Sequence, residues 1–232
     1  MNTQDNNAPY SALDLARAID HTLLKADARR EDIDRICDEA LAHGFAAVCV
    51  NGLWIGHVAQ RLAGSTVAPC AVVGFPLGAS APAAVAAEAQ LAIASGAQEI
   101  DMVMSVGEAL AGDWGAVGSG IREVQHICGD VPLKVILETC LLDDAQKRRA
   151  CEVCRELGVA FVKTSTGFST GGATTEDVAL MREVVGPDMG VKASGGIRDR
   201  ATAIALLDAG ANRLGCSAGV AIVTGGEGAE GY

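Results

Sequence analysis

The sequence predicts a single-domain α/β protein folded as a (β/α)8 barrel, and three observations lead to this prediction. The 232 residues are 50% apolar but only 3% aromatic, which is typical of one α/β domain with a core of Ala, Val, Ile and Leu. Short apolar runs alternate with helical patterns along the chain. Four helical patterns end at a glycine just before an apolar run, at Gly44, Gly96, Gly158 and Gly210. Glycine readily adopts the left-handed conformation that ends a helix, so these positions predict helix-to-strand junctions.

Eight apolar runs are expected to form strands that are buried on both faces. In chain order they are residues 18–23, 46–50, 67–73, 99–104, 133–137, 160–163, 190–192 and 213–215. Eight βα units in a chain of this length match the barrel. A doubly wound sheet is the alternative, but it usually carries G-x-G-x-x-G after its first strand, and residues 20–25 read DHTLLK instead.

Helices are expected between these runs. The first shows the spacing of a core-facing stripe at Ile33, Ile36, Cys37, Ala40 and Leu41. Helix starts are predicted near three polar residues, namely Thr174 with Asp177 three residues on, Ser80 before Pro82, and Asp199. The barrel domain is expected to span residues 11–224, between a disordered N-terminal segment (1–10) and a flexible Gly-rich tail (225–232).

Charge and hydropathy exclude several classes of partner. The net charge is −11 and no basic block occurs, which argues against nucleic acid but leaves a small phosphorylated molecule open. No apolar run of membrane-spanning length occurs, and residues 1–10 lack the basic start and apolar stretch of a signal peptide. We therefore expect a cytoplasmic protein without a membrane partner.

The eight cysteines are expected to be free thiols, as is usual in reduced cytosolic proteins. Cys151 and Cys154 have the C-x-x-C spacing of a zinc site, but no second pair follows and no histidine is near in sequence. They are interpreted as helix thiols. The four histidines are scattered singly, so the sequence predicts no metal site.

Two lysines lie at the end of an apolar run and before a turn of small residues. Lys163 precedes TSTGF and Lys192 precedes ASGGI. Each ammonium is expected where a buried strand meets its loop, and the small loop residues let backbone N–H groups approach an anion. Asp101 and Glu138 are also predicted at or near strand ends, where barrels place reactive residues. The pattern predicts lysine chemistry beside a phosphate.

The two lysines are expected to change each other's acidity. Ammoniums about 4 Å apart at an effective dielectric constant near 20 repel by roughly 4 kcal/mol, which lowers one pKa by about 3 units, from about 10.4 to near 7. A partly neutral amine attacks a carbonyl, so one lysine is predicted to be the nucleophile and the other its electrostatic activator. Asp101 is predicted to move protons through water.

Segments along nearly the whole chain resemble the deoxyribose-phosphate aldolase family. The lysine motifs KTSTGF and KASGGIR are highly specific in this order and spacing. The other matching segments are residues 19–24 (IDHTLL), 48–51 (VCVN), 74–76 (GFP), 99–103 (EIDMV), 134–142 (KVILETCLL) and 215–217 (GCS). Gly52, Ser105, Cys216 and Ala218 depart from the common family pattern, and none of these departures removes a catalytic group.

The resemblance implies a class I aldolase that reversibly cleaves 2-deoxy-D-ribose 5-phosphate to D-glyceraldehyde 3-phosphate and acetaldehyde, in the catabolism of deoxyribose phosphate. It implies that Lys163 forms the Schiff base, that Lys192 perturbs Lys163, and that Asp101 takes part in the proton relay. The iminium is then the electron sink, so no metal or other cofactor is implied. The resemblance also implies a homodimer.

The phosphate is expected to bind mainly to backbone amides in the loops after the last strands, where a short helix N-terminus adds a favourable dipole. These amides belong to Gly167, Phe168, Gly195, Gly196 and Ser217. The alternative is that the glycines only make tight turns. Asp20 and Thr22, expected at the end of the first strand, resemble family positions that line the sugar pocket.

The terminal Tyr232 carries a separate hypothesis, that it folds over the barrel mouth and assists proton transfer. A disordered end is the alternative. Three other functions compete with the aldolase. A metal-free phosphosugar isomerase would use a carboxylate or histidine base and no imine, a binding protein would not explain two converging lysines, and a related imine-forming lyase would act on another phosphorylated sugar.

Overall fold

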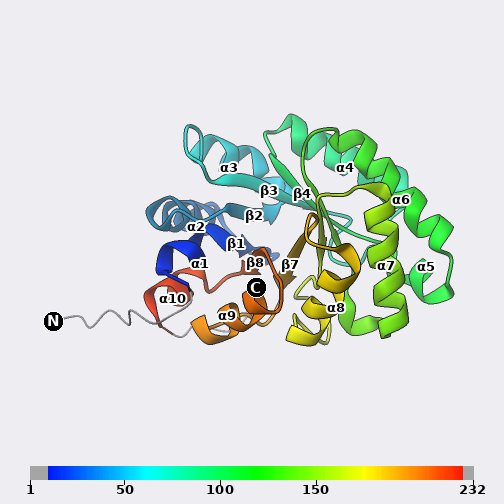
Figure 1. The fold of residues 1–232 in the computed structure, drawn as a ribbon. Coiled ribbons are helices and arrows are strands. Elements are labelled where there is room, and N and C mark those ends of the chain that lie inside the picture. Colours follow the sequence, from blue (N-terminus) through cyan, green and yellow to red (C-terminus); the bar gives the residue numbers. More distant parts are fainter. Residues whose placement is uncertain (1–9, 227–232) are drawn as a thin grey trace.

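The computed structural model describes residues 10–226 and shows a closed barrel of eight parallel strands in sequence order, β1 to β8 (Figure 1). The strands are β1 (Ile19–Leu23), β2 (Ala47–Asn51), β3 (Ala68–Val73), β4 (Glu99–Val103), β5 (Leu133–Ile136), β6 (Phe161–Lys163), β7 (Gly190–Ser194) and β8 (Arg213–Cys216). The barrel closes because β8 pairs with β1. This confirms the predicted fold, and each of the eight predicted strands matches an observed one to within two residues at either end.

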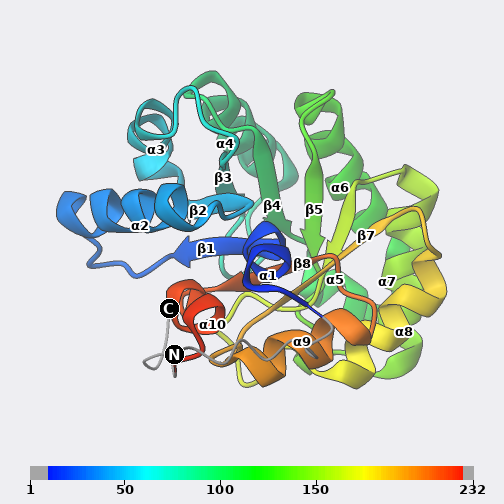
Figure 2. The same cartoon turned by 60° about the vertical axis from the view of Figure 1, so that its left-hand side comes forward.

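Helices form a layer outside the strands, as Figure 2 shows from a second side. They are α1 (Ala12–Ala18), α2 (Arg30–His43), α3 (Ile55–Arg61), α4 (Pro82–Ala94), α5 (Val106–Ala111), α6 (Trp114–Cys128), α7 (Asp144–Leu157), α8 (Thr175–Val185), α9 (Arg200–Asp208) and α10 (Gly219–Thr224), with short 3-10 turns η1 (Gly52–Trp54) and η2 (Thr139–Leu141). The first and last of these, α1 and α10, pack against each other. No helix within residues 10–226 combines the length and the apolar character needed to cross a bilayer.

The predicted junction signals act as expected at most positions. Gly44 and Gly158 end α2 and α7 with φ of 67° and 70°, in the left-handed region that glycine tolerates. Asp199 caps α9, and its carboxylate accepts a hydrogen bond from the Thr202 N–H at 2.8 Å. At α4 the cap is Ala81 rather than Ser80, because Pro82 already occupies the first helical turn and presets its φ.

The two faces of the strands carry different side chains. Outward residues such as Val48, Ile100 and Leu214 are buried with the helices in one large apolar core. A second, small apolar cluster combines Leu24, Ala47, Cys49, Cys70 and Val72, which come from β2, β3 and the end of β1. Successive side chains of a strand point to opposite faces, so this small cluster lies on the inward face.

The expected terminal segments lie mostly outside the described residues. Only Tyr10, Gly225 and Gly226 of them are described, and the backbone oxygen of Tyr10 accepts a hydrogen bond from Arg200 of α9 at 2.8 Å. The domain boundaries therefore stay a prediction. Cys151 and Cys154 are buried on α7 in the large core, as the interpretation as helix thiols requires.

Candidate active site

Charged side chains cluster in the barrel interior on β1 and on β4 to β8. Register partners in parallel strands share a face, and the pairs include Asp101 with Lys134, Lys163 with Lys192, and Lys192 with Arg213. With Asp20 and Glu99 these residues form what we call the ion network, whose seven members are Asp20, Glu99, Asp101, Lys134, Lys163, Lys192 and Arg213. All seven side chains are largely or wholly buried.

Asp101 is the centre of the ion network. Its Oδ1 accepts a hydrogen bond from Lys134 Nζ at 2.8 Å, and its Oδ2 accepts from Lys163 Nζ at 2.8 Å and from Lys192 Nζ at 2.7 Å. Burial alone would raise the pKa of Asp101, but the three ammoniums outweigh it and hold this pKa well below its usual range. Asp101 is therefore a carboxylate at neutral pH.

The rest of the ion network lies deeper in the barrel. Arg213 forms ion pairs with both Asp20 and Glu99, and these last two also pair with lysines. Lys192 Nζ lies 2.5 Å from Asp20 Oδ2, and Lys134 Nζ lies 2.7 Å from Glu99 Oε2. Counting formal charges, three lysines and one arginine face three carboxylates, so the ion network has one cation in excess.

The predicted repulsion between Lys163 and Lys192 left out the Asp101 carboxylate, which lies between the two ammoniums. A single carboxylate oxygen of Asp101 accepts from both ammoniums, so the two charges are bridged rather than opposed. Burial would lower the pKa of Lys192, but Asp101 and Asp20 outweigh burial and raise this pKa well above its usual value. Lys192 is therefore a stable ammonium, and the estimate from repulsion alone does not hold for Lys192, because it left out the carboxylates that face this lysine.

Lys163 differs from the other two lysines in position and in partners. It is the last residue of β6, and among the described carboxylates it pairs only with Asp101. Lys134 and Lys192 each pair with Asp101 and with a second carboxylate at 2.7 Å or less. Lys163 therefore has the fewest carboxylate partners of the three lysines.

The strand predicted to end at Lys192 continues for two more residues, whereas Asp101 lies near the end of β4 as expected. Asp101 and Lys192 are the third residues of five-residue strands, so their side chains meet inside the barrel. Gly215 on β8 makes room for this arrangement, because a Cβ there would lie 3.1 Å from Lys192 Cε and 2.9 Å from Ser194 Cβ. Since β7 continues for two residues past Lys192, to Ser194, the Lys192 side chain is not the last inward-facing side chain of its strand.

Glu138 follows β5 and lies apart from the ion network. Its backbone has φ of 56°, a conformation that is uncommon for a residue other than glycine. The buried carboxylate accepts hydrogen bonds from the Thr166 hydroxyl at 2.5 Å and from the Thr166 N–H at 3.2 Å. Thr166 Oγ1 in turn accepts from the Phe168 N–H at 3.0 Å. Glu138 therefore holds the shape of the loop after β6.

The loops after β6 and β7 are packed backbone to backbone. A Cβ on Gly172 would come within 2.3 Å of the Gly195 oxygen, so only glycine fits there. Gly167, Gly195 and Gly196 have φ of 86°, 86° and 79°, which fits a tight turn and also a loop whose amides face an anion. The Phe168 amide is engaged within its own loop, and the Phe168 ring packs edge-to-face on Phe75 with centroids 5.3 Å apart.

The remaining predicted residues are placed as follows. Asp20 is the second residue of β1 rather than at its end, and its wholly buried carboxylate belongs to the ion network. Thr22, two residues on, is also buried, and its hydroxyl donates a hydrogen bond to the backbone oxygen of Asp20 at 2.8 Å. Ser217 lies in the turn after β8. Tyr232 lies outside the described residues.

Sequence reasoning missed Glu99, Lys134 and Arg213 as members of this site. Glu99 and Arg213 begin their strands and Lys134 is the second residue of β5, and a charge in a strand expected to be buried on both faces was the available signal. Glu99 is also two residues before Asp101, which places both on the same face of β4. The missing information was which strands would bring these charges together.

The chain is similar to known aldolases over most of its length. The family model described as "DeoC/LacD family aldolase" matches residues 15–225. A protein of Brevibacillus brevis named deoxyribose-phosphate aldolase is 56% identical over 213 residues, which are 92% of this chain and 96% of that protein.

Solved structures show the same similarity. A candidate deoxyribose-phosphate aldolase from Coccidioides immitis superposes with a TM-score of 0.90 at 39% identity, covering 93% of this chain and 86% of the other. A tetrameric deoxyribose phosphate aldolase from Aeropyrum pernix has a TM-score of 0.84 at 32% identity, covering 92% of this chain and 91% of the other.

Proposed function

Because the chain belongs to the DeoC/LacD aldolase family, we propose that its Lys163 forms the Schiff base through which it cleaves 2-deoxy-D-ribose 5-phosphate. The enzyme is a class I aldolase that reversibly converts this sugar phosphate to D-glyceraldehyde 3-phosphate and acetaldehyde. The observation that carries the assignment to Lys163 is the excess of one cation in the ion network, in which Lys163 pairs with Asp101 alone among the described carboxylates.

The choice among the three lysines follows from electrostatics. Carboxylate partners favour the ammonium form of a lysine. Lys134 and Lys192 each have at least two such partners, whereas Lys163 has Asp101 alone among the described carboxylates, so we assign the reacting amine to Lys163. The neutral amine attacks the C1 aldehyde of the open-chain sugar, and loss of water leaves an iminium.

Cleavage then needs a proton acceptor near the iminium. The bond between C2 and C3 breaks, its electron pair moves toward the iminium, and the C3 hydroxyl loses its proton as the aldehyde of glyceraldehyde 3-phosphate forms. The Asp101 carboxylate accepts this proton, directly or through water, and returns it to C2 of the enamine. Lys192 donates a hydrogen bond to the same Asp101 oxygen, Oδ2, as Lys163, so its ammonium lies beside this proton relay. Hydrolysis of the iminium releases acetaldehyde and restores Lys163.

The substrate phosphate lies, in this proposal, over the loops after β6, β7 and β8, against the amides of Gly167, Gly195, Gly196 and Ser217. Support comes from the positive φ of the three glycines and from the close packing of the first two loops. Phe168 takes part through its ring at the rim, because its amide is hydrogen-bonded to Thr166. Asp20 acts indirectly by holding Lys192, and Thr22 lies one level nearer the mouth.

Glu138 is a positioning residue in this proposal, and its variant tests the phosphate site. Glu138→Gln keeps the size of the side chain but replaces a charge-assisted hydrogen bond to the Thr166 hydroxyl, a bond of about 1.5–3 kcal/mol. We expect KM for 2-deoxyribose 5-phosphate to rise about tenfold or more, while kcat/KM for unphosphorylated 2-deoxyribose stays near wild type. An equal loss for both sugars would mean a general folding defect and contradict the proposal.

Borohydride trapping tests the proposed nucleophile. The protein is incubated with 2-deoxyribose 5-phosphate, reduced, digested and analysed by peptide mass spectrometry. A reduced adduct on Lys163 is expected. An adduct on Lys192 or Lys134 would overturn the assignment of roles, and no adduct with intact substrate would argue for a phosphosugar isomerase or a phosphosugar-binding protein.

Self-association as a homodimer and a cytoplasmic location stay predictions. The Aeropyrum relative is tetrameric, which supports association in this family without giving its order here. Light scattering after size exclusion would measure the mass in solution, and a monomer at micromolar concentration would contradict the homodimer.

A further inference from the structure

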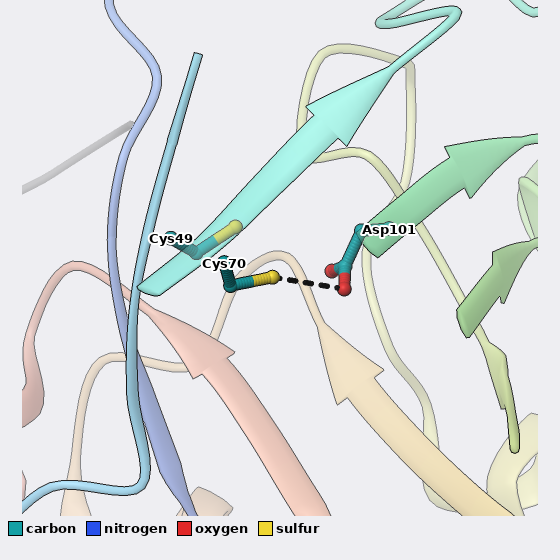
Figure 3. A group of neighbouring side chains, drawn as sticks. All are labelled: Cys49, Cys70 and Asp101. Atoms are coloured by element: carbon teal, nitrogen blue, oxygen red, sulfur yellow. Dashed lines mark hydrogen bonds between the residues drawn. The ribbon is translucent and has the colours of Figure 1, made fainter. Parts of the chain in front are cut away.

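Two cysteines lie beside the ion network without a part in the proposed reaction. Cys49 on β2 and Cys70 on β3 are register partners, and both are wholly buried. The Cys70 thiol donates a hydrogen bond to Asp101 Oδ1 at 3.2 Å. The two Sγ atoms and a carboxylate oxygen of Asp101 all lie within 4.8 Å of one another, and Figure 3 shows the thiols beside the carboxylate on three successive strands.

We propose that Cys49, Cys70 and Asp101 bind a thiophilic divalent cation such as Zn²⁺ or Cd²⁺, and that the bound cation inhibits the enzyme. Binding rests only on the geometry of the three residues. The inhibition rests on the proposed role of Asp101, so the two parts of the inference are measured separately.

The donor set and its spacing suit such a cation. Zn²⁺ takes thiolate sulfur at about 2.3 Å and carboxylate oxygen at about 2.0–2.2 Å, which in a tetrahedron places the donor atoms roughly 3.5–3.8 Å apart. Cys70 Sγ and Asp101 Oδ1 are already 3.2 Å apart. The third donor needs only a side-chain adjustment, because Cys49 and Cys70 are direct partners on neighbouring strands. Water completes the four-coordinate site.

The charge of the barrel interior does not change when the cation binds. A divalent cation brings two positive charges, and the two thiols each release a proton to become thiolates, so the sum stays the same. The nearby ammoniums favour the thiolates, and Lys134 Nζ lies 3.5 Å from Cys70 Sγ. A hard cation of equal charge prefers oxygen donors, so Mg²⁺ is not expected to bind here.

Binding would take Asp101 out of the proton relay. The oxygen that now accepts from Cys70 would become a metal ligand, and a carboxylate that donates electron density to a cation is a weaker base. Turnover should therefore fall, and a chelator should restore it.

Cd²⁺ titration tests binding directly, because thiolate-to-cadmium charge transfer absorbs in the ultraviolet whether or not the enzyme turns over. The wild-type protein should gain one saturable thiolate band per chain and lose activity in parallel, and EDTA should reverse both. Mg²⁺ should change neither. Cys49→Ala, which leaves the reacting groups intact, should keep its basal activity and bind Cd²⁺ at least about 100-fold more weakly, since even a hydrogen-bond partner of a metal ligand is worth about 10–100-fold.

Cys140→Ala is the matched control, because Cys140 is the one exposed cysteine among the eight. It should behave as wild type in both readouts. A band and inhibition that survive in Cys49→Ala but vanish in Cys140→Ala would overturn the site. Absence of any thiolate band in the wild type would also overturn it.

The conservative variant Cys49→Ser covers the case in which Cys49→Ala does not fold. It should bind Cd²⁺ with a band of about half the wild-type intensity, because one thiolate remains, and an unchanged band would contradict the proposal. A wild-type band without inhibition would keep the metal site and reject the proposed role of Asp101.

Discussion

On the outward faces of the strands, Ile100, Val162 and Leu214 pack into the apolar layer under the helices. On the inward faces of the same strands, the adjacent residues Asp101, Lys163 and Arg213 form ion pairs. Both sets are buried, but an apolar side chain needs only the right volume, whereas a buried charge needs a partner of opposite sign at a defined place. The two faces therefore respond to substitution in different ways.

The largest effect on activity is expected at Lys163, the inward-facing lysine with the fewest carboxylate partners. Lys163→Met removes the nucleophile, so kcat/KM for 2-deoxyribose 5-phosphate should fall by at least about 10⁴-fold. The free energy of unfolding should change little, because the ion network is left with three cations and three carboxylates. A kinetic assay and urea denaturation measure the two quantities. A Lys163→Met variant that keeps much of the wild-type kcat/KM would contradict the assignment of Lys163 as the nucleophile. A variant that unfolds in dilute urea would contradict the count of cations and carboxylates.

Lys134→Met breaks the same ion network at its other end. The numbers of cations and carboxylates are again equal, but here two buried carboxylates, Glu99 and Asp101, each lose a close partner, and breaking a buried ion pair costs about 3–5 kcal/mol. Urea denaturation should show this loss. The matched control is Arg148→Met, which breaks the exposed pair with Glu183 and should cost less than about 1 kcal/mol. Equal losses in the two variants would show that burial of the ion network has no energetic consequence.

Asp101→Asn separates imine formation from turnover. The amide keeps the shape of the side chain but cannot accept the C3 hydroxyl proton, so kcat should fall by about 10²–10⁴-fold. Borohydride should still trap the sugar on Lys163, because the nucleophile is retained. Unchanged kcat would exclude Asp101 from the proton relay.

The smallest effect is expected one residue away, on the outward face. Ile100→Val removes one buried methylene from the layer under the helices and should lower the free energy of unfolding by about 0.5–1.5 kcal/mol. Kinetic constants should match the wild type, since Ile100 is turned away from Asp101. A fall in kcat comparable to that of Asp101→Asn would mean that the two faces are not independent.

Much of this protein could be predicted from local patterns. The apolar runs, the terminal glycines such as Gly44 and Gly158, and the cap at Asp199 act within a few residues of themselves. The motifs around Lys163 and Lys192 likewise identified two reacting residues of the proposed site. By contrast, the level of Lys192 in the barrel was missed, because the end of β7 depends on its pairing with β8 through Ser194.

The sequence alone thus determined the order of eight strands, the helices between them and the lysine chemistry, since helix and strand periodicity and turn residues are short-range properties. Only the tertiary structure decided which charges meet. Arg213 and Asp20 are 193 residues apart in the chain and become partners because β8 closes the barrel against β1. The balance of four cations against three carboxylates exists only after that closure, because it is the sum of charges from six different strands.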